Sequence, residues 1–132
     1  MNSPAKDICT ILEQTRWALS LVFGTNLFVD ILPENPDLAV SVFNLGGRPP
    51  LSLETVHEYP SIQIMVRGGR GGQVAAYDLS HNIKIALHKL TDEIISSVRY
   101  LEIVAQGDIL TIGSDSRQRP LYSINFNLYR TY

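Results

Sequence analysis

Few residues in this 132-residue chain have the types and spacing that catalysis or metal binding requires. Its three histidines are His57, His81 and His88. His81 and His88 lie seven residues apart on a predicted helix, which separates them by two turns, too far to hold one metal ion together. The sequence contains neither an HExxH nor a CxxC motif. We therefore expect no metal centre and interpret both helix histidines as solvent-exposed.

The other reactive side chains also favour structural roles. His57 and Glu58 are neighbours in a predicted strand, so their side chains point to opposite faces and cannot form a dyad. Cys9 has no histidine close in sequence, and a free cysteine is most often a small buried hydrophobe. Ser114-Asp115-Ser116 offers hydroxyls and a carboxylate, but in a hairpin these most often cap the turn. We predict a protein that is not an enzyme and that uses no cofactor.

The segment from Arg67 to Gly72, with sequence RGGRGG, is the sharpest local anomaly. Glycines expose backbone amides and arginines supply positive charge, which favours contact with phosphate or nucleic acid. The segment is not a phosphate-binding loop, because no Lys-Ser/Thr pair follows it. It is also typical of a mobile connector between a strand and a helix. Both interpretations hold if the loop projects into a DNA conduit, with Arg67 and Arg70 as the DNA-facing residues.

Composition places the chain among ordinary globular proteins. Hydrophobic residues make up 45% and charged residues 18%, which predicts a single domain over residues 1–132 rather than a disordered chain. The net charge of -2 argues against a dedicated nucleic-acid binder. One cysteine excludes an internal disulfide and fits folding in a reducing cytoplasm. No apolar segment is long enough to span a bilayer, so we expect a soluble protein with no membrane partner.

Hydrophobic periodicity predicts an α+β fold. Amphipathic helices are expected over 4–22, with Ser3 as the N-cap, and over 73–90. Strands are expected over 27–32, 40–44, 55–67, 100–106, 109–113 and 120–132. Clean alternation in the later strands favours antiparallel pairing with one wetted or partner-facing side. We predict a mostly antiparallel, or mixed, sheet with the two helices packed on one face.

Surplus apolar residues on the first predicted helix indicate association. Trp17 lies about 180° from the core stripe on a helical wheel, and Leu21 lies about 40° from Trp17. Tryptophan is enriched among interface anchors, so both residues are candidate contacts with a partner. Burial of this face under the protein's own chain is the alternative.

The most informative stretch covers residues 28–50, FVDILPENPDLAVSVFNLGGRPP. Pro33 and Pro36 prevent a helix or central strand from running through the turn. Two glycines and two prolines then close the segment. This layout resembles the signature region of the phage minor capsid or tail-completion family, the tail terminators. The resemblance continues in layout through residues 59–67, 76–88 and 119–130.

The resemblance implies a structural role in a virion. Proteins of this kind form a ring, a homohexamer, at the head-proximal end of a long phage tail. The ring caps the tube of the major tail tube protein, ends its elongation and offers the surface that head connector proteins join. The expected location is thus the head–tail junction, after assembly in the host cytoplasm, with passing contact to phage DNA. Physically, such a ring requires a heterologous contact that closes by rotation.

The loop at the end of the signature is the predicted contact with a neighbouring subunit, through Asn44, Gly46, Gly47, Arg48 and Pro49. Glycines allow close approach and prolines limit the entropy lost on docking. Arg48 would pair with a neighbour's carboxylate, for which the sequence offers Asp30, Glu34 and Asp37.

Two alternatives stay open. The first is a head-side connector, meaning a stopper, an adaptor or a minor capsid subunit. The second is a small nucleic-acid-binding module that uses Arg67, Arg70, Arg117 and Arg119.

Overall fold

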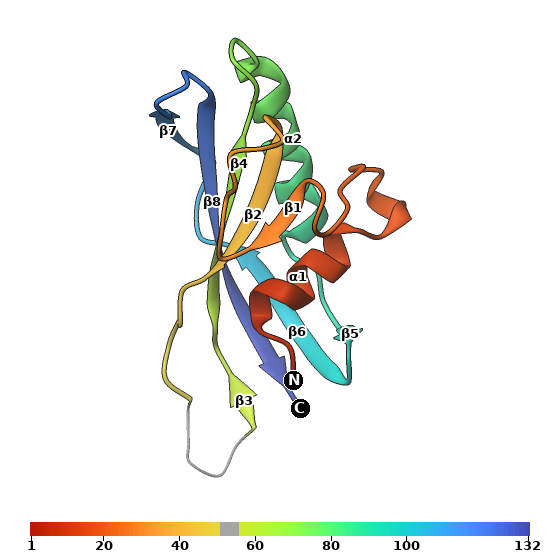
Figure 1. Cartoon of the computed structure of the whole chain (residues 1–132). Coiled ribbons are helices and arrows are strands. Elements are labelled where there is room, and N and C mark those ends of the chain that lie inside the picture. Colours follow the sequence, from red (N-terminus) through yellow and green to blue (C-terminus); the bar gives the residue numbers. More distant parts are fainter. Residues whose placement is uncertain (51–55) are drawn as a thin grey trace.

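A mixed, curled sheet with two helices makes up the computed structural model, which describes residues 1–50 and 56–132 (Figure 1). The helices are α1 (Pro4–Leu12) and α2 (Gln73–Leu87), and a short 3-10 helix covers Thr15–Trp17. The strands are β1 (Leu27–Val29), β2 (Ala39–Asn44), β3 (His57–Glu58), β4 (Ser61–Arg67), β5 (Glu93–Ile95), β6 (Val98–Ala105), β7 (Leu110–Ser114) and β8 (Pro120–Thr131). The predicted α+β class is confirmed. Within the described residues no helix is long and apolar enough to cross a membrane.

The long strand β8 organises the sheet. β4 and β3 pair along one of its edges, and β6 and β7 pair with it as well, so that the main strand order is β1-β2-β4-β8-β6-β5. These pairings are antiparallel, whereas β1 lies parallel to β2. The sheet is therefore mixed.

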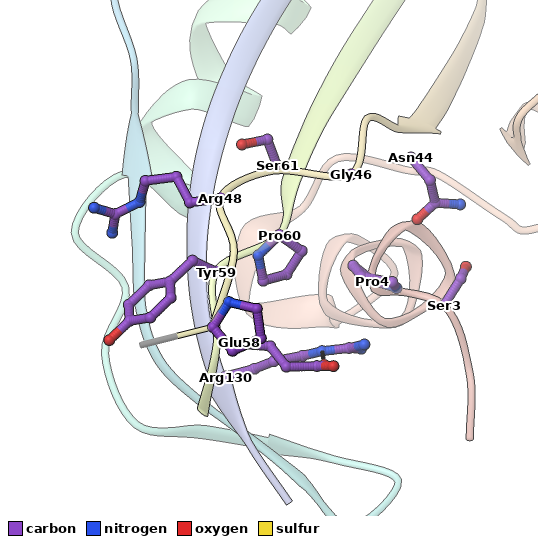
Figure 2. Close-up of a pocket in the computed structure, with 11 residues that line it drawn as sticks. Ser3, Pro4, Asn44, Gly46, Arg48, Glu58, Tyr59, Pro60, Ser61 and Arg130 are labelled. Atoms are coloured by element: carbon purple, nitrogen blue, oxygen red, sulfur yellow. Dashed lines mark hydrogen bonds and ion pairs between the residues drawn. The ribbon is translucent and has the colours of Figure 1, made fainter. Parts of the chain in front are cut away.

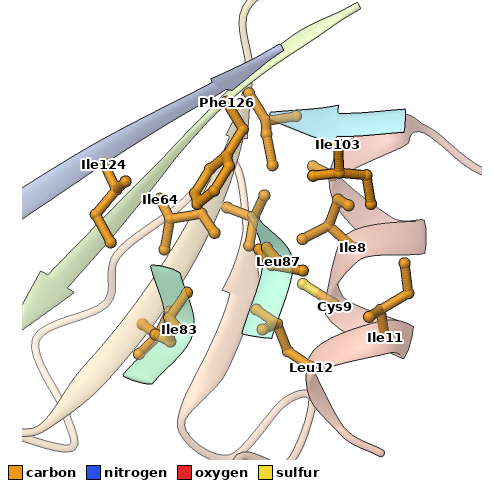
Figure 3. Close-up of a cluster of buried hydrophobic side chains, with 14 of the residues drawn as sticks. Ile8, Cys9, Ile11, Leu12, Ile64, Ile83, Leu87, Ile103, Ile124 and Phe126 are labelled. Atoms are coloured by element: carbon orange, nitrogen blue, oxygen red, sulfur yellow. The ribbon is translucent and has the colours of Figure 1, made fainter. Parts of the chain in front are cut away.

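The core lies on one face of this sheet. Val42, Ile64 and Ile124 are opposite one another on adjacent strands and are all fully buried. Both helices add side chains to the same buried cluster, α1 through residues such as Ile8 and α2 through residues such as Leu87 (Figure 3). Burial of each large apolar side chain contributes about 1.5–3 kcal/mol.

The first helix is much shorter than predicted. It begins as expected, because Ser3 Oγ accepts a 3.2 Å hydrogen bond from the amide of Lys6. It ends at Leu12 rather than Val22, since the following chain folds back across the helix end. There the amide of Phe23 donates to Glu13 Oε2 at 3.1 Å. Side-chain acceptors such as Glu13 and Asn26, which binds the amide of Val22, offer the backbone an alternative to helical hydrogen bonds.

Other boundaries move for local reasons. The strand predicted over 55–67 separates into β3 and β4 around Pro60, and its residue 55 lies outside the described residues. The strand predicted over 27–32 stops at Val29, because Asp30 has a positive φ of 58°. α2 ends at Leu87, where His88 is the C-cap and its Nδ1 accepts a 3.0 Å hydrogen bond from the amide of Ala105. β5 was not predicted from the sequence.

Candidate functional site

Residues 45–50 and 56–60, here called the arm, lie between β2 and β4 in the chain and include β3, which pairs with the end of β8. The amide of Leu45 donates to the carbonyl of Ser61 at 3.0 Å, and the amide of Arg48 donates to the carbonyl of Tyr59 at 2.9 Å. Gly47 lies between these bonds with φ +105°, and a Cβ there would lie 2.1 Å from the carbonyl oxygen of Tyr59. The close backbone approach that this glycine permits is therefore made within its own chain.

Arg48 and Tyr59 form a ridge at the base of the arm. The Arg48 guanidinium lies 4.6 Å from the centre of the Tyr59 ring, a cation–π contact. The Tyr59 ring packs on Tyr129 of β8 at 4.8 Å between centres, and the Tyr129 hydroxyl lies 3.1 Å from Nδ1 of His57. Because aromatic and arginine side chains dominate binding hot spots, this ridge of the exposed Arg48 and the half-buried Tyr59 is a candidate contact surface.

A hollow lies on each side of the ridge. The arm-base hollow has a volume of about 300 Å³, and Figure 2 shows how its lining side chains lie (Ser3, Pro4, Asn44, Gly46, Arg48, Pro50, Glu58, Tyr59, Pro60, Ser61, Arg130). A second hollow of about 220 Å³ lies between the ridge and β6 (Arg48, Tyr59, Glu102, Val104, Asn127, Leu128, Tyr129). The walls of the first hollow come from α1, the arm and β8, so only the folded chain assembles it.

A buried chain of polar groups supports the arm-base hollow. Arg130 donates from Nε to Glu58 at 2.8 Å and from a terminal nitrogen to the Tyr100 hydroxyl at 3.4 Å. Tyr100 in turn donates to Asp7 Oδ2 at 2.6 Å. Burial raises the pKa of Asp7 above its ordinary value, although the hydrogen bond from Tyr100 acts in the opposite direction. The chain thereby links α1, β6, β8 and β3 beneath the hollow.

The strap, residues 30–38, begins at Asp30, which bonds to Asn44, and two buried arginines hold its residues 34–37 at the other end of β4. Arg119 donates to the carbonyl of Glu34 at 2.6 Å and to its carboxylate at 3.0 Å. Arg119 also forms ion pairs with Asp37 at 3.2 Å and with Asp115 at 2.8 Å, although its own side chain is only 3% exposed. Arg67 donates to the strap carbonyls of Pro36 and Asp37 at 2.5 and 3.0 Å.

Asp115 shows how a turn supports that clamp. Its Oδ1 accepts hydrogen bonds from the amides of Arg117 and Arg119, each at 2.9 Å, so it caps the turn before β8 as expected. The Arg119 amide is the main reason that the pKa of the Asp115 carboxyl lies below its ordinary value. The carboxylate stays ionised, and its negative charge balances the positive charge of the buried Arg119.

Two predicted site residues have other roles. Leu21 lies beyond the end of α1, is 6% exposed and belongs to the core cluster, so the fold of its own chain accounts for this apolar side chain. Arg67 is 3% exposed and is bonded to the strap, so it is not a DNA-facing side chain.

Trp17 is half-buried against the core, with the Arg16 guanidinium 4.4 Å from its ring centre. Arg70 is exposed on its loop.

Part of the predicted contact loop, residues 44–49, forms hydrogen bonds within its own chain, and the rest is exposed. Asn44 is half-buried, and its side chain accepts from the amide of Ala5 at 3.0 Å and donates to Asp30 at 2.9 Å. Gly46, Gly47, Arg48 and Pro49 are exposed. Asp30 bonds within the subunit, as do Glu34 and Asp37 through Arg119. Among the described residues Arg48 forms no ion pair.

The cysteine and the helix histidines that were considered as reactive groups do not gather into a metal-binding group in the described residues, and Cys9 is in the core. Cys9 is fully buried in the core, and burial raises the pKa of its thiol to about 12. No group of three or more metal-ligating side chains occurs within residues 1–50 and 56–132. His81 is exposed on α2, as predicted, whereas His88 is half-buried.

Sequence reasoning missed the character of β7. All five of its residues are exposed, including Leu110 at 54% and Ile112 at 49%. One edge of β7 pairs with β8, and no described strand pairs with the other edge. Natural edge strands usually carry charges or prolines that block further pairing, whereas LTIGS carries neither. That absence of protecting residues was visible in the sequence.

The described surface combines two hollows with an edge strand that exposes apolar side chains. A family model described as "Bacteriophage tail terminator protein" matches residues 14–132. The chain belongs to this family, so its role is structural and related to the phage tail. The resemblance stated from the sequence is confirmed.

Two solved structures have the same fold. A chain from the virion of a native gene transfer agent particle aligns with a TM-score of 0.71 and 14% identity, covering 98% of this chain and 96% of that one. A second solved protein structure aligns with a TM-score of 0.60 and 8% identity, over 98% of both chains. No curated protein matches the chain.

Proposed function

We propose that this protein forms a ring, a homohexamer, that caps the tail tube at the head–tail junction. The ring ends addition of the major tail tube protein and provides the surface that head connector proteins join. Family membership over residues 14–132 is the observation that carries the proposal. Similarity of nearly the whole chain to one from a gene transfer agent virion adds support.

The surface of the chain fits assembly. The unpaired edge of β7 exposes two aliphatic side chains, and edges of this kind accept strands from another chain through main-chain hydrogen bonds. Val74 adds further exposed apolar area at 86% exposure. A ring subunit needs two different complementary surfaces, and the contact closes by rotation.

Arg70 is our candidate for passing contact with phage DNA. It lies in the glycine-rich loop between β4 and α2, and its side chain is exposed. Arg70→Ala should leave folding and ring formation intact and reduce infectivity. Arg117→Ala, which removes another exposed arginine, is the matched control.

The decisive experiment measures assembly. Mass measurement and negative-stain imaging of the pure protein at high concentration, and after mixing with purified tail tubes, should show closed six-fold rings or capped tube ends. A strict monomer that also fails to bind tail tubes contradicts the proposal.

Three of the four arginines on which the nucleic-acid-binding alternative depends are buried or lie close to a carboxylate in the structure. Arg67 and Arg119 are buried and hold the strap, and Arg117 lies 3.5 Å from Glu34. The isolated protein should therefore show weak binding in a gel shift with duplex DNA at low salt. Tight, strongly salt-dependent binding by the monomer favours that alternative.

A further inference from the structure

We propose that the strap of one copy docks in the arm-base hollow of the next copy, and that this contact joins neighbours around the ring. The inference rests on the proposed function, since it assigns the surfaces by which that ring closes. It concerns Ile31 and Glu34 of the strap on one side, and the ridge and hollow at the base of the arm on the other.

The strap is rigid, yet it presents apolar surface to solvent. Two buried arginines bind its carbonyls and carboxylates through the bonds given above, and prolines at 33 and 36 further restrict its backbone. Nevertheless Ile31 is 61% exposed and Leu38 is 44% exposed. A segment ordered in advance loses little entropy on docking, which makes it a suitable contact element.

The arm-base hollow is large enough for the exposed Ile31 side chain, here called the knob. Its volume of about 300 Å³ exceeds what one isoleucine side chain needs, and Pro4, Pro50 and Pro60 provide apolar walls. The same prolines stiffen the rim. Arg130, which is 8% exposed, and its partner Glu58 form a polar wall (Figure 2).

Charge also matches across this contact. At the hollow and ridge Arg130 is paired with Glu58, so the exposed Arg48 is the guanidinium group that has no ion pair among the described residues. The Glu34 and Asp37 side chains of the strap remain 73% and 59% exposed, although both pair with Arg119. Docking would bring the exposed Arg48 guanidinium to an acidic neighbour, and opposite potentials of this kind align partners.

The knob and the hollow are different surfaces of one chain, as a head-to-tail contact requires. Ser61 at the start of β4 lines the hollow, and Arg67 at the end of β4 binds Pro36 and Asp37 of the strap. Ile31 lies at the beginning of the strap, next to Asp30, which bonds to Asn44. A contact between two such different surfaces is heterologous, so each copy engages two neighbours.

Cysteine cross-linking tests the contact directly. The variant Ile31→Cys with Pro50→Cys places one thiol on the knob and one on the rim of the hollow. Native Cys9 is buried, with its thiol pKa raised to about 12, and does not compete. Under mild oxidation, rings of this variant should give a ladder of covalent multimers on a denaturing gel. Ile94→Cys with Pro50→Cys is the control and should give none.

A second variant measures the contribution of the knob. Ile31→Ser should raise the protein concentration for half-maximal ring assembly at least about tenfold, because the docked isoleucine side chain is lost. Ile94→Ser removes an equally exposed isoleucine outside the contact and should have no such effect. The thermal midpoints of both monomers should equal that of the wild type.

The outcomes separate this inference from the proposed function. Rings that form normally with Ile31→Ser, or that give no covalent ladder from Ile31→Cys with Pro50→Cys, overturn the docking contact and leave the ring proposal standing. A wild-type chain that forms no ring, alone or on tail tubes, overturns both.

Discussion

Tyr100 donates its hydroxyl proton to Asp7 Oδ2 across 2.6 Å, and neither residue has exposed surface. The other carboxylate oxygen of Asp7 has no hydrogen-bond partner among the described residues. The fully buried carboxyl group of Asp7 on α1 therefore depends on Tyr100 of β6 for its side-chain hydrogen bond. Loss of it leaves a buried polar group unsatisfied, which costs more than the hydrogen bond itself contributes.

Tyr100→Phe should consequently lower the free energy of unfolding by about 1–3 kcal/mol. Chemical denaturation of the monomer measures this change. Tyr77→Phe alters a tyrosine that is 43% exposed and should have little effect. Equal stability losses in the two variants would show that the Asp7 contact is not special.

Asp7 should make stability depend on pH. Burial raises its pKa above the ordinary 3.8, so the folded state favours the protonated carboxyl. Its favourable contribution is full below the unfolded pKa and is lost as pH rises through the folded pKa. Asp7→Asn does not titrate there, and should gain stability relative to the wild type as pH rises above the unfolded pKa of about 4. A pH-independent difference between the two proteins contradicts this assignment.

Arg119→Ala should release the strap without unfolding the sheet. The variant removes the bonds to Glu34, Asp37 and Asp115 that hold residues 30–38. Hydrogen exchange should accelerate in the strap amides and remain unchanged in β4 and β8. Arg117→Ala removes only the longer, exposed 3.5 Å ion pair with Glu34 and should accelerate exchange in the strap much less. Uniform protection of the strap in Arg119→Ala would mean that Arg67 suffices to hold it.

Gly47→Ala should open the base of the arm. Its Cβ would collide with the carbonyl of Tyr59, and positive φ adds strain of about 1–3 kcal/mol. Gly46→Ala introduces similar positive-φ strain with no atom within 4 Å, so the pair isolates the collision. Thermal denaturation should rank Gly47→Ala as the less stable variant, with weaker ring assembly. Equal midpoints would show that residues 45–50 move freely away from Tyr59.

Cys9 should be inert in the folded protein. Its thiol is fully buried and its raised pKa, about 12, leaves almost no thiolate near neutral pH. An aromatic disulfide reagent at pH 8 should react with it only after denaturant is added. Rapid labelling of the native protein would place Cys9 outside the core.

Much of the fold could be predicted from local pattern alone. Alternation in β8 and helical periodicity in α2 indicated their type and approximate range, because side-chain periodicity is a direct consequence of backbone geometry. Proline and glycine punctuation in residues 28–50 indicated the family that the match over residues 14–132 confirms. Asp115 was correctly expected to cap its turn, since that interaction is local in sequence.

Tertiary structure decided the rest, because the deciding contacts join residues distant along the chain. The sequence could not show that α1 would stop at Leu12, since the chain beyond it is held by later acceptors such as Asn26. Nor could it show that Arg67 would hold the strap 30 residues earlier instead of facing outward. The pairing of Arg48 with Tyr59 and the hollow beside them likewise exist only when the arm meets α1 and β8. Residue types fixed the available chemistry, and long-range packing chose which side chains remain free for a partner.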